Sequence, residues 1–144
     1  MDALRIAGFT VKSVLVWDRM HHGMGDLKGS FAPRYDTCIF ATKGRYTLPN
    51  GRPDDVIQCQ RLNSGELVHP NEKPIALMRQ LIEATTEPGA LILDPFACSG
   101  STLAAAALTG RRYIGIEINA EYHALAQQRA LEATKTRLLK GADL

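Results

Sequence analysis

The stretch LILDPFACSGST, residues 91–102, decides the fold of this 144-residue chain. Three apolar residues run into Asp94-Pro95-Phe96, and small residues then lead into an alanine-rich segment. This order is typical of a buried strand, a sharp turn and the first turn of a helix. In α/β sheets a small ligand binds at such a place, outside the carboxyl end of a strand. The stretch therefore predicts a ligand site.

The segments on either side extend this unit into a helix–strand–helix–strand–helix order. The expected elements are a helix from Pro74 to Glu87, strands at 90–93 and 113–118, a helix at 101–109 between them, and a last helix after Asn119. Pro74 suits a first helical position, Asn119 suits a cap, and the tail after Thr134 is expected to fray. The order predicts a right-handed βαβ unit of a doubly wound sheet.

The first 68 residues read as strands joined by irregular segments. The expected elements are a short helix at 1–8 closed by Gly8, strands at 9–17 and 35–42, and short strands at 56–57 and 67–68. The connection at 18–33 is long for a hairpin, which predicts a functional or mobile loop.

Composition excludes several classes of protein. The chain is 45% hydrophobic and 22% charged, as ordinary globular domains are, and we expect a single domain over 1–144. No apolar run could span a bilayer and no signal peptide is recognisable, so we expect a soluble cytoplasmic protein with no membrane partner. The three cysteines form no C-x-x-C pair and the adjacent His21 and His22 point apart, so we expect neither disulfides nor a metal site.

The turn at 94–102 has the features of a nucleoside-cofactor site. Glu117 follows about 20 residues after the strand end, where such sites place the acid that accepts the ribose hydroxyls. The turn contains only Gly100, which disfavours a dinucleotide such as NAD, and the chain has no P-loop motif. An acid at Asp94 beside several hydroxyls suits a ligand with an ammonium and a carboxylate, as in S-adenosylmethionine.

Three motifs resemble those of the DNA N6-adenine/N4-cytosine methyltransferases. Residues 94–102 resemble the family's Asp-Pro-Phe-x-Gly-Ser-Gly-Thr-Thr cofactor motif, and residues 69–74, HPNEKP, resemble its His-Pro-Thr-x-Lys-Pro signature. Residues 113–118, YIGIEI, resemble the next strand with its ribose-binding acid. The order, with recognition segment first and cofactor motif last, is that of the family's circularly permuted β class.

The resemblance implies a fold, a cofactor and a set of contacts. The fold is α/β, a partial Rossmann-like methyltransferase fold with a βαβ cofactor half and an antiparallel strand pair. Residues 1–44 hold the strand pair and loop, 45–68 the target-recognition segment, and 69–134 the cofactor-binding half. The residues expected to bind S-adenosylmethionine are Lys73, Pro74, Asp94, Pro95, Phe96, Ser99, Gly100, Ser101, Thr102, Glu117 and Ile118.

The family's catalytic Asp/Asn/Ser-Pro-Pro-Tyr/Phe motif is absent from this sequence. No residue here is nominated as catalytic, and we expect an upstream polypeptide or a second copy to supply that strand, unless the chain is a fragment. Its absence leaves open a non-catalytic subunit or remnant of a split methyltransferase. The enzyme that the resemblance implies transfers a methyl group to the exocyclic amine of adenine (N6) or of cytosine (N4) in DNA, with adenine the favoured target, in restriction–modification or in a phage or prophage.

Duplex DNA is the partner that the resemblance implies. The basic residues expected to face it are Lys28, Arg34, Arg45, Arg52 and Arg61, which would hold phosphates and not read sequence. Two positions depart from the family's pattern. Cys98 stands where glycine is usual, which we expect to weaken cofactor binding, and Asn71 replaces a common threonine.

Overall fold

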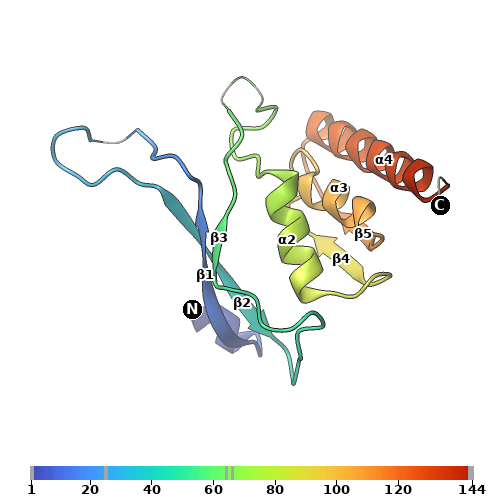
Figure 1. Ribbon diagram of the computed structural model, residues 1–144, viewed down its shortest axis with the longest axis horizontal. Coiled ribbons are helices and arrows are strands. Elements are labelled where there is room, and N and C mark those ends of the chain that lie inside the picture. Colours follow the sequence, from blue (N-terminus) through green and yellow to red (C-terminus); the bar gives the residue numbers. More distant parts are fainter. Residues whose placement is uncertain (1, 25, 64, 66, 143–144) are drawn as a thin grey trace. The chain divides into compact units, whose positions relative to one another are not determined.

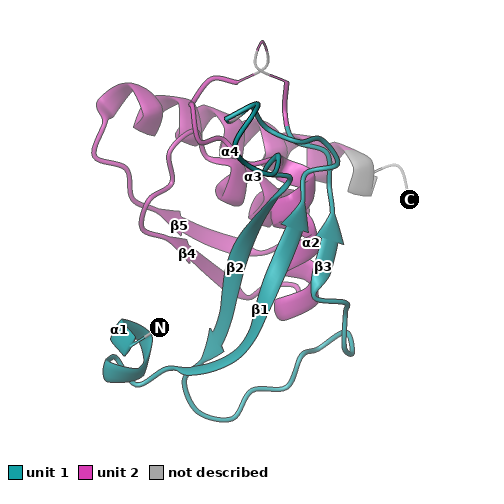
Figure 2. Cartoon of the chain, turned by 90° about the vertical axis from the view of Figure 1, so that its left-hand side faces the viewer, with its two compact units in different colours: residues 1–61 teal, residues 62–144 magenta. Residues whose placement is uncertain are grey.

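The computed structural model describes residues 2–24, 26–63, 65 and 67–142, and the chain divides into two compact units (Figure 1). The first unit spans residues 1–61 and the second spans 62–144, as the two colours of Figure 2 show. In the described part of the chain, no helix has the length and apolar character needed to cross a membrane.

The first unit is a three-stranded sheet with one short helix. Its elements are α1 (Asp2–Ile6), β1 (Thr10–Asp18), β2 (Tyr35–Thr42) and β3 (Val56–Gln58), and the strand order is β2-β1-β3. β1 pairs antiparallel with β2 and parallel with β3. The Trp17 indole N–H donates to the Cys59 carbonyl at 2.7 Å, which fastens the chain after β3 to β1. The predicted strand pair and the short strand at 56–57 are confirmed.

The second unit has the predicted helix–strand–helix–strand–helix order. Its elements are α2 (Ile75–Thr85), β4 (Leu91–Asp94), α3 (Ser101–Leu108), β5 (Arg112–Gly115) and α4 (Ala120–Ala142). β4 and β5 pair in parallel, with Leu91 opposite Arg112 and Asp94 opposite Gly115. The two strands are joined through α3, so the βαβ unit expected from the sequence is confirmed.

Small side chains form the core of the second unit. Five consecutive residues of α3, Leu103–Ala107, are buried, and Ala126 and Ala130 of α4 pack with Leu103 in one cluster. Alanine leaves little side chain between helices, which allows α3 and α4 to approach closely. Tyr113 of β5 packs against all three clusters of this core.

Among the described residues of the second unit, side chains pack against only one face of the β4–β5 sheet. Ile92 and Tyr113 pack against the buried alanines, whereas Leu91, Leu93 and Ile114 point the other way and are exposed. Parallel sheets in proteins are normally covered on both faces. The described residues of the second unit therefore leave this apolar face exposed.

Several predicted boundaries are wrong, each for a local reason. β5 ends at Gly115 and not at 118, because the chain turns around the Glu117 carboxylate, which accepts the Asn119 N–H at 2.9 Å. Pro74 is the N-cap of α2, one residue before the first helical position. The tail after Thr134 does not fray, since α4 continues to Ala142.

The short strand expected at 67–68 is also wrong. Neither residue is extended in a sheet, because the Glu72 carboxylate accepts the backbone N–H groups of Val68 (3.0 Å) and His69 (3.4 Å). A backbone donor that is held by a side chain is lost to a strand ladder. The segment is therefore a turn that leads into α2.

Candidate functional site

The turn after β4 is fastened to the end of β5 by backbone hydrogen bonds. The Ile116 N–H donates to the Asp94 carbonyl, and the Ala97 N–H donates to the Ile116 carbonyl, both at 2.9 Å. The Asp94 carboxylate accepts the Phe96 N–H at 3.0 Å, which starts the turn. Both strands therefore end at one edge with the turn above them, the arrangement in which parallel sheets bind ligands.

Gly100 lets this turn lie directly against α4. It has φ +84°, a left-handed conformation, and a Cβ built on it would lie 2.6 Å from Cα and 2.8 Å from Cβ of Ala126. No side chain fits in that space, so only glycine satisfies both the backbone angle and the contact. The Gly100 carbonyl then accepts the Ala104 N–H and opens α3.

Cys98 also has a left-handed backbone, with φ +47°. A side chain in this conformation is strained, which explains why glycine suits the position better. Burial raises the pKa of the Cys98 thiol, and the negative charges of Glu117 and Asp94 raise it further. The thiol therefore stays protonated at neutral pH and is a poor nucleophile.

Replacing Cys98 with glycine is expected to stabilise the second unit by about 1 kcal/mol, because it removes the cost of a left-handed non-glycine residue. The melting temperature should rise by about 4 °C in a thermal scan followed by circular dichroism. Cys98→Ala keeps the Cβ and is the matched control, for which no gain is expected. Equal gains for both variants would show that the thiol and not the backbone is the cause.

Glu117 lies two residues beyond β5 and joins the turn to α4. Its carboxylate accepts the N–H of Cys98 at one oxygen and the N–H of Asn119 at the other, both at 2.9 Å. The Asn119 hydrogen bond is the main cause that holds the Glu117 pKa below its ordinary value of 4.5, and it outweighs desolvation. Glu117 is therefore an oriented carboxylate, charged at neutral pH, that can still accept from a ligand.

A cavity of about 340 Å³ lies beside this carboxylate. Its lining includes the polar residues Glu117, His123 and Gln127 and the largely apolar residues Leu103, Tyr113 and Ala126. Binding sites for small molecules are typically apolar hollows with a few placed polar groups. The cavity and the Glu117 carboxylate can together accommodate a nucleoside-sized group.

The other predicted cofactor residues differ in exposure. Phe96 and Ile118 are exposed, whereas Ser99 and Ser101 are buried. The Ser101 hydroxyl has no hydrogen-bond partner in the described part of the chain. A buried hydroxyl without a partner is rare and calls for one, so this atom is available to a polar ligand.

The loop before α2 contributes Lys73 and Pro74 from the same unit. The Pro74 carbonyl accepts the N–H groups of Leu77 (3.1 Å) and Met78 (3.2 Å), so the loop ends at a fixed helix start. The Thr102 hydroxyl lies 3.6 Å from the Met78 sulfur. The second unit therefore contains all the predicted cofactor residues, and the turn, the Glu117 segment and α2 are held by contacts within it.

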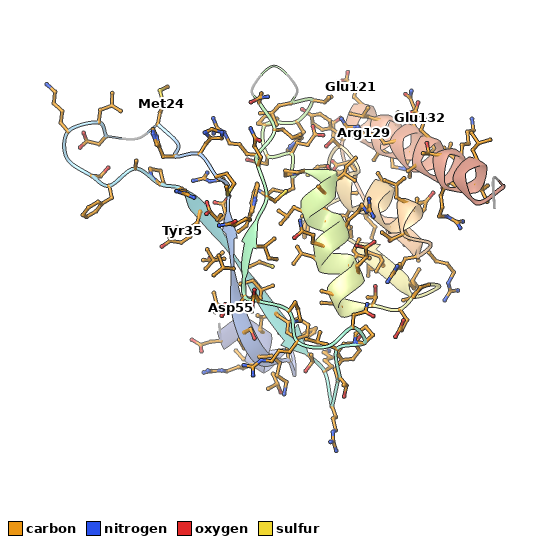
Figure 3. All side chains as sticks on the ribbon, in the orientation of Figure 1. Met24, Tyr35, Asp55, Glu121, Arg129 and Glu132 are labelled. Carbon is orange, nitrogen blue, oxygen red and sulfur yellow. The ribbon has the colours of Figure 1, made fainter. Side chains whose placement is uncertain are left out.

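Sequence reasoning missed an ion pair that supports the turn. Glu72 and Arg129 form this pair, and Figure 3 labels Arg129 on α4. The Glu72 side chain is only 4% exposed, and Arg129 also donates to the Ser99 carbonyl at 3.3 Å. The pair therefore joins three segments of the site. Nothing local in the sequence marks it, because the partners are 57 residues apart.

The predicted DNA-facing residues belong to the first unit, and all are exposed. The Arg34 guanidinium donates two hydrogen bonds to the Asp18 carboxylate, at 2.7 and 2.8 Å. This bidentate ion pair raises the pKa of Arg34 and lowers the pKa of Asp18. Arg34 therefore has a structural partner. In the described part of the chain Lys28, Arg45, Arg52 and Arg61 form no ion pair. Among the described residues no cluster of metal ligands is found.

Known proteins match this chain over most of its length. The family model N6_N4_Mtase, described as DNA methylase, matches residues 1–128. "Putative methylase YubD" of Escherichia coli K12 is 41% identical over 142 residues, which are 99% of this chain and 60% of that protein. "DNA adenine methyltransferase YhdJ" of the same organism is 54% identical over 54 residues, 38% of this chain and 18% of that protein.

A solved structure agrees with these sequence matches. The crystal structure of the M1.HpyAVI–SAM complex is 28% identical and superimposes with a TM-score of 0.77, over 89% of this chain and 66% of that one. The chain thus spans about 60% of the length of YubD and about two thirds of M1.HpyAVI.

Proposed function

The chain belongs to the N6/N4 DNA methylase family, and from that premise we propose that it supplies the S-adenosylmethionine-binding part of a DNA methyltransferase. The complete enzyme would methylate the exocyclic amine of adenine (N6) or of cytosine (N4) in duplex DNA. The family and the α/β fold agree with the expectations from the sequence motifs. Adenine is the favoured target, because YhdJ, which is named as an adenine methyltransferase, shares 54% identity over 54 residues.

One observation carries the proposal: the Glu117 carboxylate is bonded to the N–H of Cys98 within the Asp94 turn. The acid suited to the ribose and the turn suited to the amino-acid end are thereby held side by side. The residues present fit the cofactor in chemistry as well. Asp94 can accept from an ammonium, and the unpartnered Ser101 hydroxyl can serve a polar group.

The chain's own residues would bind and orient. Glu117 would hold the ribose, Asp94 and the 99–102 segment the amino-acid end, and the Lys73-Pro74 loop would close the site. When bound, S-adenosylmethionine would supply the activated methyl group. No residue here is proposed as catalytic. An upstream polypeptide or a second copy would supply the acceptor-binding motif, and its segment is a candidate cover for the bare face of β4 and β5. The cytoplasm, where DNA is accessible, is the proposed location.

Calorimetric titration of the chain with S-adenosylmethionine, and separately with NAD, tests the proposal. We expect binding of the first and not of the second. Glu117→Gln should lower the affinity at least tenfold, because either amide orientation turns an N–H₂ against a backbone N–H donor. Glu121→Gln, an exposed acid in the first turn of α4, is the matched control and should bind normally. Binding of NAD alone would refute the proposal.

The pH dependence of the affinity for S-adenosylmethionine follows from the lowered pKa of Glu117. The contribution of an ionised Glu117 is complete above its ordinary pKa of 4.5 and is lost as the pH falls through the lowered value. Affinity for the cofactor should therefore be flat from pH 7 to pH 5 and decline only below. The Glu117→Gln variant should lack that decline.

A second candidate function, a non-catalytic subunit of a split methyltransferase, is favoured by the missing catalytic motif. Transfer of a labelled methyl group to duplex DNA separates the two. We expect transfer only when an upstream polypeptide that carries the motif is added. Transfer by the chain alone would show that the catalytic group lies within these 144 residues. If the chain binds the cofactor but no methyl group is transferred with or without the upstream polypeptide, the function that remains is that of a non-catalytic subunit.

A further inference from the structure

The loop between β1 and β2, residues 19–34, carries exposed apolar side chains at its tip. Met24 is 93% exposed, Leu27 is 86% exposed and Phe31 is fully exposed. Figure 3 labels Met24, and Figure 1 shows the loop extending beyond the ends of its two strands. Large apolar side chains gathered on one exposed loop mark an interaction surface.

The base of this loop is fixed. The Arg19 guanidinium donates to the Pro33 carbonyl at 2.8 Å and to the Arg34 carbonyl at 3.2 Å. Arg34 in turn contacts Asp18 through both carboxylate oxygens, and the Gly23 N–H donates to the Pro33 carbonyl at 2.6 Å. These contacts close the loop just above the strands, so the tip is presented from a braced base.

The tip itself is an ordered turn. The Asp26 carboxylate accepts the Lys28 N–H at 3.0 Å, and the Ser30 hydroxyl donates to the Asp26 carbonyl at 3.2 Å. A Cβ on Gly29 would lie 2.3 Å from the Asp26 carboxylate, so the turn requires glycine there unless Asp26 moves. The turn keeps the Asp26 carboxylate on its own backbone and leaves Leu27, Lys28 and Phe31 exposed.

The chemistry of the tip favours duplex DNA over an apolar protein surface. The cations of the loop are Arg19, Lys28 and Arg34, of which Arg19 pairs with Asp36 and Arg34 pairs with Asp18. In the described part of the chain, Lys28 forms no ion pair. Proteins that unstack DNA insert Phe, Leu or Met between base steps and place cations on the adjacent phosphates. An enzyme that modifies a base must also extrude it from the duplex.

We propose that the 19–34 loop is a DNA wedge: Phe31 inserts between base steps beside the target base, Leu27 and Met24 pack along the opened step, and Lys28 contacts a phosphate. This inference rests on the proposed function, since it names how the same enzyme holds its DNA. It assigns the long loop a role in opening the duplex.

Fluorescence anisotropy with a labelled duplex, at saturating S-adenosylmethionine, tests the wedge. Phe31→Ala should weaken binding at least tenfold, as the loss of one base–aromatic contact does, whereas Phe31→Trp should keep it. Ile6→Ala, which truncates another exposed apolar residue of the same unit, is the matched control and should stay within twofold. Lys28→Gln should reduce the slope of log affinity against log salt by about 1.

A duplex with 2-aminopurine at the opened step gives a second readout. The native chain should raise its fluorescence, and Phe31→Ala should not do so even at saturation. A Phe31→Ala variant with native affinity and a native fluorescence change would overturn the wedge. The wedge would also be overturned if the native chain failed to bind the duplex and instead self-associated through Phe31 in a sedimentation experiment. Failure to bind S-adenosylmethionine in the titration above refutes the proposed function itself, whereas binding of the cofactor and of DNA without Phe31 refutes only the wedge.

Discussion

Replacing Gly100 with alanine is expected to lower the free energy of unfolding of the second unit by about 3 kcal/mol and to abolish cofactor binding. A left-handed residue with a Cβ costs about 1–2 kcal/mol. Overpacking adds about 1–3 kcal/mol, because the new Cβ would lie 2.6 Å from a backbone atom of Ala126 that cannot rotate away. Either the turn or α4 must shift, and the turn carries the predicted cofactor contacts.

Gly89→Ala is the matched control for this prediction. Gly89 has nearly the same angle, φ +81°, but nothing lies within 4 Å of its built Cβ. Gly89→Ala should therefore lower the free energy of unfolding only by the cost of a left-handed residue with a Cβ, about 1–2 kcal/mol. Urea unfolding followed by circular dichroism reports on α2, α3 and α4, and the fluorescence of Trp17, the single tryptophan, reports on the first unit. Equal losses for the two variants would show that the contact with Ala126 does not matter.

Removing Arg129 is expected to cost about 3–5 kcal/mol, because it leaves the buried Glu72 carboxylate without its cationic partner. Arg129→Met keeps an unbranched aliphatic stem and the helix propensity of the position while it removes the charged guanidinium group, so the loss reports chiefly on the charge. The cofactor affinity should fall as well, since Arg129 also holds the Ser99 carbonyl. Urea unfolding and calorimetric titration measure the two effects.

The control is the exposed pair Arg79–Glu83 of α2, at 3.3 Å. Arg79→Met should cost less than about 1 kcal/mol, as exposed ion pairs do. Adding Glu72→Gln to Arg129→Met removes the buried charge and should recover part of the loss. If Arg129→Met cost no more than Arg79→Met, the pair would have no structural role.

The Glu72–Arg129 pair also predicts how the free energy of unfolding depends on pH. Burial opposes the ionisation of Glu72, but the hydrogen bonds from Arg129, Val68 and His69 outweigh it, and the pKa lies below its ordinary value of 4.5. The stabilisation from a lowered pKa is complete above the ordinary value and is lost as the pH falls through the lowered one. The difference in stability between the native chain and Glu72→Gln should therefore be constant above the ordinary pKa of 4.5 and shrink only as the pH falls below it.

The sequence by itself determined the type and order of the regular elements from α2 to α4. Residues 91–94 and 101–108 could be placed because apolar runs, proline and glycine act over a few neighbouring positions. The motifs at 69–74, 94–102 and 113–118 identified the family, and the match of the family model over residues 1–128 confirms that assignment. The ends of elements were less certain, since β5 and α4 end where hydrogen bonds and packing place them.

Only the tertiary structure decided how the site is held together. The Glu72–Arg129 pair and the contact of Gly100 with Ala126 join residues 57 and 26 positions apart, and no local pattern encodes such partners. The parallel pairing of β1 with β3 and the left-handed backbone at Cys98 are likewise products of packing. Periodicity reports which face of an element is buried, whereas the identity of the atoms that meet it is fixed when the chain folds.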